Sequence, residues 1–254
     1  MMSESLDLSI ILPALLAGLL VLVTHVPLGA QVLKRGIVFI DLAIAQIAAL
    51  GVIMAGMADL DPQGWMVQLA AGSAAVLGAF LLTWTEKRWP EVQEAQIGVL
   101  FVLAATGGLL LLAHNPHGGE HLRDLLAGQI LWVNYTQLVV PAIGTLLISL
   151  VLYFFGQRIG RLGFYLIFAL AVTASVQLVG VYLVFASLIV PSLGARNYLE
   201  QRRLPLAFGI GIGGYAIGLV LSTLFDLPSG ALIVWSLAAL AILAYAFGPK
   251  QAHA

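Results

Sequence analysis

The stretch that decides the fold is LGFYLIFALAVTASVQLVGVYLVFASLIVPSLGA, residues 162–195, which contains no charged side chain. A helix needs about 20 apolar residues to cross the hydrocarbon core of a bilayer. This stretch therefore holds either one long helix or two short helices that break near Gly180. Irregular backbone inside a membrane is tolerated only where protein covers it or where it lines a cavity. We expect a broken or re-entrant pair of helices here, with the break between Gln177 and Gly180.

The rest of the chain has the same apolar character. Of its 254 residues, 61% are hydrophobic and 9% are charged, with a mean hydropathy of +1.03. Soluble domains carry about 25% charged residues, so this chain cannot cover a water-facing surface. We predict one all-α, polytopic membrane domain over residues 1–254. The net charge of −1 excludes a basic nucleic-acid interface, and the absence of cysteine excludes disulfides and thiolate metal sites.

Apolar runs between polar breaks predict about nine transmembrane helices, or eight if residues 162–195 form a single helix. The predicted spans are 8–28, 37–57, 64–85, 96–113, 136–156, 162–177, 179–195, 205–225 and 229–247. With nine spans, ten of the eleven lysine and arginine residues fall on one side, and Arg123 is the exception. Cytoplasmic loops are enriched in these residues. The pattern therefore favours nine spans in the inner membrane of a cell, with the N-terminus outside and the C-terminus inside.

One external loop concentrates side chains that bind transition metals. It reads HNPHGGEH and carries four candidate ligands: His114, His117, Glu120 and His121. Imidazole and carboxylate together suit zinc, so we predict a loop that captures or passes metal ions. A polar loop without a metal function is the alternative. The letters also fit the H-x-x-E-H pattern of zinc proteases, but the proline and glycines disfavour the helix that this pattern needs.

Three polar side chains are predicted within the spans and are assigned to a translocation pathway: Asp41, Gln46 and Gln177. A carboxylate at membrane depth costs roughly a few kcal/mol or more, so it usually faces a cavity or a partner. Asp41 lies close to its helix start, and contact with interfacial water is the alternative. Gln46 follows five residues later, so the two side chains are not expected to share a helix face. For Gln177, a hydrogen bond between helices is the simpler interpretation.

Two further features limit the function. The segment LRDLLAGQILWVNY, residues 122–135, is too short to span and reads as an interfacial or re-entrant helix with Trp132 and Tyr135 at headgroup depth. The chain has no G-x-x-x-x-G-K-[ST] phosphate-binding loop. If transport uses ATP, hydrolysis belongs to a partner chain, and this chain is not expected to be an enzyme.

Several stretches resemble the metal-ion permeases of ABC transporters, the zinc, manganese and iron group. VQLVGVYLVFASLIVPSLGAR, residues 176–196, is similar to that family's V-G-x-x-L-V-x-x-L-L-I-x-P-x-x-x-A-R block. The matching positions are Val179, Gly180, Leu183, Ile189, Pro191, Ala195 and Arg196. FDLPSGALIV, residues 225–234, looks like the family's aromatic-D-x-P-x-G stretch, with Asp226, Pro228 and Gly230 matching. IGVLF (97–101) and LRDLLAGQILWV (122–133) resemble two further family segments.

The resemblance implies the membrane subunit of an ABC importer for a divalent metal ion, zinc first and manganese or iron otherwise. It implies a homodimer with an ATP-binding subunit inside, an extracytoplasmic metal-binding protein outside, and alternating access between them. The metal is a substrate, and no permanently bound cofactor is expected. The external histidines would lie where the binding protein hands over its ion.

Two features depart from the family pattern. The family usually carries D-x-x-x-H in the second helix, whereas the position four residues after Asp41 is Ala45. Alignment from Gly51 instead puts Gln46 at the histidine position and misplaces Asp41, so the histidine is missing in either alignment. The family also has a long cytoplasmic loop that docks on the ATPase, and here only GQRIGRLG, residues 156–163, separates two spans. Arg158 and Arg161 of this loop are the predicted ATPase contacts. The short loop also leaves open a stand-alone carrier, or a degenerate permease without an ATPase.

Overall fold

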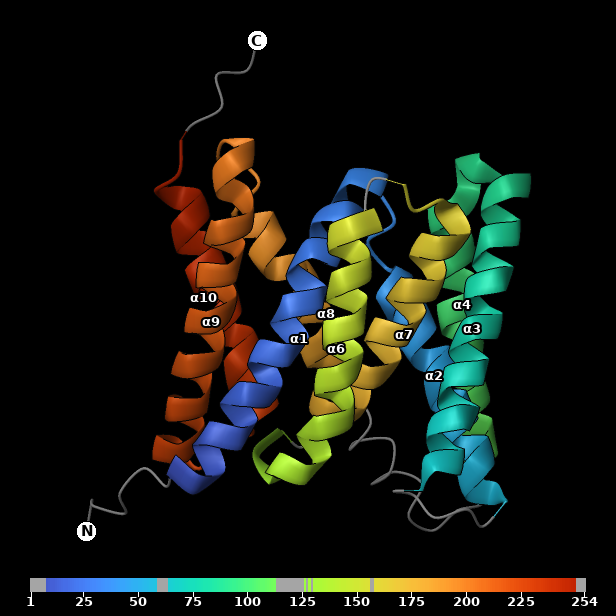
Figure 1. The fold of residues 1–254 in the computed structure, drawn as a ribbon, viewed down its shortest axis with the longest axis horizontal. Helices are drawn as coiled ribbons and strands as arrows, with labels where there is room; N and C mark the ends of the chain where they lie inside the picture. The colour runs from blue at the N-terminus through green and yellow to red at the C-terminus, as the bar shows by residue number, and fades with distance from the viewer. Residues whose placement is uncertain are drawn as a thin grey trace.

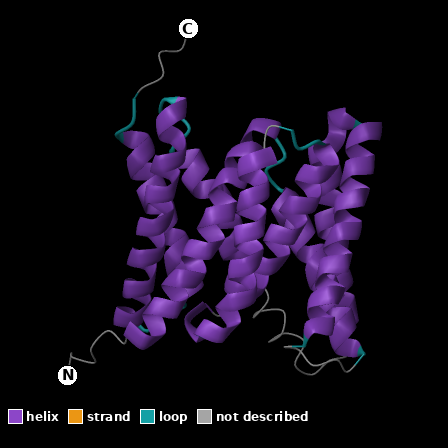
Figure 2. Ribbon diagram, viewed as in Figure 1, coloured by secondary structure: helices purple, strands orange, loops and turns teal. Residues whose placement is uncertain are grey.

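The computed structural model describes residues 8–58, 64–112, 126, 128, 130–155 and 158–249. These residues form helices joined by short loops, with no strand among them (Figure 2). The helices, arranged as a bundle in Figure 1, are α1 (Leu8–Arg35), α2 (Ile40–Met57), α3 (Trp65–Arg88), η1 (Pro90–Val92), α4 (Gln93–Leu112), η2 (Ile130–Trp132), α6 (Tyr135–Phe155), α7 (Arg161–Val179), α8 (Val181–Gly194), α9 (Glu200–Phe225) and α10 (Ser229–Ala246).

The described helices confirm a polytopic, all-helical membrane protein. Eight of them are long and apolar enough to cross a bilayer, and α8 is a shorter apolar helix of 14 residues. At about 1.5 Å per residue, α8 is roughly 21 Å long, which is less than the ~30 Å hydrocarbon core. α1 begins at the lower end of the bundle in Figure 1, and α10 ends at the upper end. An odd number of crossings, with α8 as the ninth, accounts for this arrangement.

Residues 162–195 form two helices, as the nine-span prediction requires. Gly180 separates α7 from α8 with φ 81° and ψ 162°, a conformation that is essentially restricted to glycine. Its N–H closes the last turn of α7 on the Val176 carbonyl at 2.8 Å, and its carbonyl accepts from Val184 N at 3.1 Å. Both backbone groups of the break are therefore satisfied by the two helices themselves.

A second segment covers this break. Gly128 lies so close to it that a Cβ at that position would overlap the Val179 carbonyl. The turn η2 follows directly, with Ile130 buried and Trp132 80% exposed. In the described part of the predicted interfacial segment, Gly128 thus lies against the α7–α8 break, and the 3-10 turn η2 contacts α1 and α10. The irregular backbone is covered by protein, which a membrane requires.

The helix α1 packs against α8 and α9 through glycines. A Cβ at Gly29 would overlap the Leu188 carbonyl of α8, and one at Gly18 would overlap the Tyr215 ring of α9. Lipid tails are as apolar as the helices, so helix association in membranes relies on the close backbone approach that small residues permit. These contacts fix α1 in the middle of the bundle.

Several helices extend beyond the predicted spans. α1 continues past Pro27 to Arg35, and α9 begins at Glu200 rather than at 205. Hydropathy marks the part of a helix that lies in hydrocarbon, whereas the backbone hydrogen bonds continue into the polar interface. Proline is also tolerated in membrane helices, so Pro27 does not end α1.

Candidate translocation site

The carboxylate of Asp41 is buried at the start of α2. The chain turns at Gly36 after α1, and Figure 1 shows α2 beginning deeper in the bundle than the end of α1. Asp41 is 1% exposed, and neither of its oxygens has a hydrogen-bond partner among the described residues. The backbone N–H groups of Asp41 and Leu42, in the first turn of the helix, face the carboxyl group. The positive end of the helix dipole therefore partly offsets the buried charge.

Two side chains from other helices hold the start of α2. The Glu94 carboxylate of α4 accepts a hydrogen bond from the backbone N–H of Phe39 at 3.3 Å. The Phe39 ring stacks on Phe185 of α8, with 6.4 Å between ring centroids and 5° between planes. The turn that presents Asp41 is therefore fixed from both α4 and α8.

Gln46 and Gln177 do not join Asp41. Gln46 is 7% exposed and lines a cavity of about 10 Å³ with Ala104, Gly108 and Val181, which is space for about one water molecule. Five residues turn a helix by about 500°, so Gln46 lies roughly 140° around α2 from Asp41. Gln177 is exposed near the end of α7. The structure places the three predicted pathway residues at three separate positions.

The position that carries histidine in the family pattern lies on the same face of α2 as Asp41. It is Ala45, which is 1% exposed and one turn further along the helix. No group of three or more His, Cys, Asp or Glu side chains occurs within the described ranges. The predicted loop ligands, His114, His117, Glu120 and His121, lie outside those ranges.

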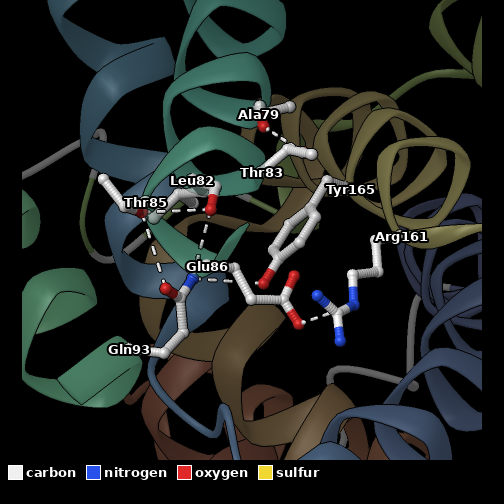
Figure 3. Close-up of polar contacts among 8 residues, drawn as sticks. All are labelled: Ala79, Leu82, Thr83, Thr85, Glu86, Gln93, Arg161 and Tyr165. Atoms are coloured by element: carbon white, nitrogen blue, oxygen red, sulfur yellow. Dashed lines mark hydrogen bonds and ion pairs between the residues drawn. The ribbon is translucent and has the colours of Figure 1, made fainter. Parts of the chain in front are cut away.

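A second polar cluster, which the sequence did not reveal, joins α3, α4 and α7 (Figure 3). The Gln93 amide donates to the Tyr165 hydroxyl at 3.2 Å and to the Leu82 carbonyl at 3.3 Å. The hydroxyl lies beside the Glu86 carboxylate. That carboxylate forms an ion pair with Arg161 at 3.5 Å. The predicted ATPase contact Arg161 is thus also attached to α3, while Arg158 is exposed in the loop.

His25 is a further buried polar residue that sequence reasoning missed. It is 0% exposed within α1, and its Nδ1 lies 3.0 Å from both the Val21 carbonyl and the Thr24 hydroxyl. Its Nε2 has no hydrogen-bond partner in the described part of the chain. Its position inside an apolar helix could have indicated burial, but the sequence does not show which helix it faces.

The bundle and its buried carboxylate can be compared with known proteins. The sequence model of the ABC 3 transport family matches residues 7–164 and 158–248, which is nearly the whole chain. The chain belongs to the ABC 3 transport family. It is a multi-pass protein of the cell membrane and a non-catalytic transport component. Membership in this family confirms the resemblance that the sequence motifs predicted.

Curated relatives of similar length are named for three metals. The chain is 29% identical to the manganese transport system membrane protein MntC of Halalkalibacterium halodurans, covering 98% of this chain and 90% of the relative. It is 24% identical to the zinc uptake membrane protein ZnuB of Haemophilus influenzae, covering 89% and 92%. A probable iron transport membrane protein of Haemophilus influenzae is 24% identical, covering 96% of both chains.

A solved structure has the same fold. One chain of PsaBC from Streptococcus pneumoniae, determined in complex with Fab, superposes with a TM-score of 0.77 at 20% identity. The match covers 95% of this chain and 93% of that one. The helix arrangement in Figure 1 is therefore shared with a solved structure.

Proposed function

We propose that this chain is the permease subunit of an ABC importer that moves a divalent transition-metal ion across the cell inner membrane. The observation that carries the proposal is the Asp41 carboxylate, which is buried within the bundle and has no side-chain partner among the described residues. Ionisable groups inside a membrane are costly and generally mark ion pathways. In a family whose relatives are named for manganese, zinc and iron transport, a divalent cation is the natural counter-charge.

Two regions of the chain favour different metals. The external loop with His114, His117 and His121 offers imidazole, which suits zinc. The helix α2 offers a carboxylate, with Ala45 where the family usually has histidine. Carboxylate and water ligands suit manganese. Zinc remains the first candidate because of the loop, and manganese is the alternative that the α2 site favours.

The permease would work as a homodimer with an ATPase dimer and an extracytoplasmic metal-binding protein. ATP binding and hydrolysis on the partner chain would switch the helices between outward-open and inward-open arrangements. The break at Gly180 supports this mechanism, since two short helices that meet at a glycine can tilt separately. Arg158 and Arg161 remain the proposed ATPase contacts.

The short loop supports a second candidate, a carrier that works without an ATPase. α6 ends at Phe155 and α7 begins at Arg161, which leaves no room for the docking helix of the family pattern. In this case the Glu86–Arg161 ion pair would serve only to hold α3 against α7.

Metal uptake by proteoliposomes separates the two candidates. The permease is purified from its native host under mild conditions, and any co-purifying ATPase is identified. The complex is reconstituted with the host's metal-binding protein and ⁶⁵Zn or ⁵⁴Mn outside. If the chain belongs to an importer, uptake should require ATP inside those proteoliposomes in which the ATPase faces the lumen. Asp41→Asn should abolish this uptake. Co-purification of no ATPase, together with metal flux that ATP does not change, would favour the carrier instead.

A further inference from the structure

A cavity of about 460 Å³ opens between α1, α8 and α9, where α1 and α8 end and α9 begins. Figure 1 shows α1 and α9 close together where α1 starts and diverging toward the other end. The side-chain contacts agree, because Gly18 meets Tyr215 and Gly211 meets Leu22 in the converging part. The cavity lies in the diverging part, at the end of the bundle that carries the basic helix termini. The distribution of charge predicts that this end faces the cytoplasm.

Positive charge dominates the rim of this cavity. Lys34, Arg196 and Arg203 line it together with a single carboxylate, Glu200. The Lys34 ammonium pairs with Glu200 at 3.2 Å, which leaves the charge of the two arginines in excess. Both guanidinium groups are held in place. Arg203 Nε donates to the Tyr198 carbonyl at 2.8 Å, and Arg196 lies 5.3 Å from the centroid of the Tyr245 ring.

The wall below the rim is apolar. Ala30 lies five residues before the end of α1, and Ala207 lies seven residues after the start of α9. At about 1.5 Å per residue, these positions are roughly 7 to 10 Å deeper than the helix ends. An extended peptide inserted here would need hydrogen-bond partners for its backbone. Apart from Ser192, whose hydroxyl donates to the Val26 carbonyl at 3.4 Å, the described side chains below the rim are alanine and leucine, which supply none. An acyl chain needs no such partner.

We propose that this cavity binds an anionic phospholipid of the inner leaflet. The phosphate would lie between Arg196 and Arg203, and one acyl chain would lie along Ala30 and Ala207. Basic pockets between membrane helices on the cytoplasmic side suit anionic headgroups, and arginine binds phosphate through paired N–H groups. The lipid would fill the space where α1 and α9 diverge. This cavity lies in a different part of the bundle from Asp41, and lipid binding there does not depend on which ion is carried.

Lipid binding to the purified permease tests the proposal. The test variant is Arg196→Gln with Arg203→Gln, which keeps the Lys34–Glu200 pair. The matched control is Lys87→Gln with Arg88→Gln, which removes the same charge at the same end of the bundle. Detergent-solubilised proteins are titrated with phosphatidylglycerol or phosphatidylcholine, and bound lipid is counted by native mass spectrometry. The elution volume in gel filtration verifies that each variant is folded, and Arg203→Gln alone serves if the double variant is not.

We expect the wild type to prefer phosphatidylglycerol and the test variant to bind it about 25-fold more weakly, about fivefold for each cation. The control should bind like the wild type, and inorganic phosphate at the same concentration should not displace the lipid. Equal weakening in the test and control variants would overturn the proposal. Displacement by inorganic phosphate would identify a free-anion site instead. Unchanged lipid binding combined with loss of a co-purifying ATPase would identify the rim as a protein contact.

Discussion

Two carboxylates near the same end of the bundle have opposite surroundings. Glu86 at the end of α3 forms an ion pair with Arg161 and lies beside the Tyr165 hydroxyl, and its side chain is 19% exposed. Asp41 at the start of α2 is 1% exposed and has no partner among the described residues. Among the described residues, Glu86 therefore has a counter-charge and Asp41 has none.

The difference separates a structural site from a functional one. A buried polar group that finds its partners within the chain adds a little to stability, whereas an unpaired buried charge is expensive. Such a charge is retained when something outside the chain compensates it. For Asp41 the proposed compensation is the transported cation. Substitutions at the Glu86 site should therefore lower stability, and substitutions at Asp41 should lower transport.

The largest effect is expected for Asp41→Asn. Removing the carboxylate should lower metal uptake at least about tenfold, as for a lost metal ligand, while the free energy of unfolding stays the same or rises because a buried carboxyl group with no partner among the described residues is gone. Proteoliposome uptake and denaturation of the folded permease measure the two quantities. The control is Glu91→Gln, since Glu91 is exposed in the α3–α4 turn. Normal uptake by Asp41→Asn would show that Asp41 is not required for transport.

Gly180→Ala should affect both stability and transport. A side chain at φ 81° and ψ 162° strains the backbone by about 1–3 kcal/mol, and relief of that strain would shift α7 relative to α8. The midpoint of denaturation reports the loss. Gly144→Ala in α6 is the matched control, since a Cβ there meets open space. Equal stability of the two variants would show that the break does not require glycine.

Tyr165→Phe should act on stability alone. The change leaves the Gln93 amide without its hydroxyl acceptor and removes the hydroxyl beside Glu86, which should cost about 1–2 kcal/mol. Tyr182→Phe, at a side chain that is 57% exposed on α8, should cost nothing measurable. Uptake per folded molecule should match the wild type for both variants. A selective loss of uptake in Tyr165→Phe would make this cluster part of the transport machinery.

Arg161→Ala should have the smallest effect on stability. Its side chain is 55% exposed, and ion pairs of this kind contribute at most about 1 kcal/mol. Arg158→Ala in the same loop is the comparison variant. If the loop contacts an ATPase, both variants should lower the amount of ATPase that co-purifies. Full retention of the ATPase by both variants would place docking on another surface.

Local properties of the sequence account for most of the fold. Hydropathy located every span because a bilayer selects apolar runs of a certain length, although α1 ends seven residues later and α9 begins five residues earlier than predicted. The break in residues 162–195 was predictable because Gly180 and the positive-inside count both pointed to it. The helix ends were less accurate, since helical hydrogen bonds continue beyond the hydrocarbon.

The candidate site was only partly predictable. Asp41 was predictable as a candidate because it is a carboxylate in an apolar helix. Its burial was not predictable, because it depends on where α2 begins relative to the end of α1. The separation of Gln46 from Asp41 followed from helix periodicity, and the structure agrees. The contact between Gln93 and Tyr165 was invisible, because it joins residues 72 positions apart. Pairing across that distance depends on helix packing, which no local pattern encodes.

Metal binding to the permease tests the central claim most directly. The background variant carries His114→Ala, His117→Ala and His121→Ala, so that the external loop adds no zinc sites. Equilibrium titration with zinc and with manganese then compares this background with and without Asp41→Asn. If Asp41 is a metal ligand, the background variant should bind metal at one site that Asp41→Asn weakens at least about tenfold, with an unchanged denaturation midpoint. Equal metal affinity in the two proteins would contradict this prediction.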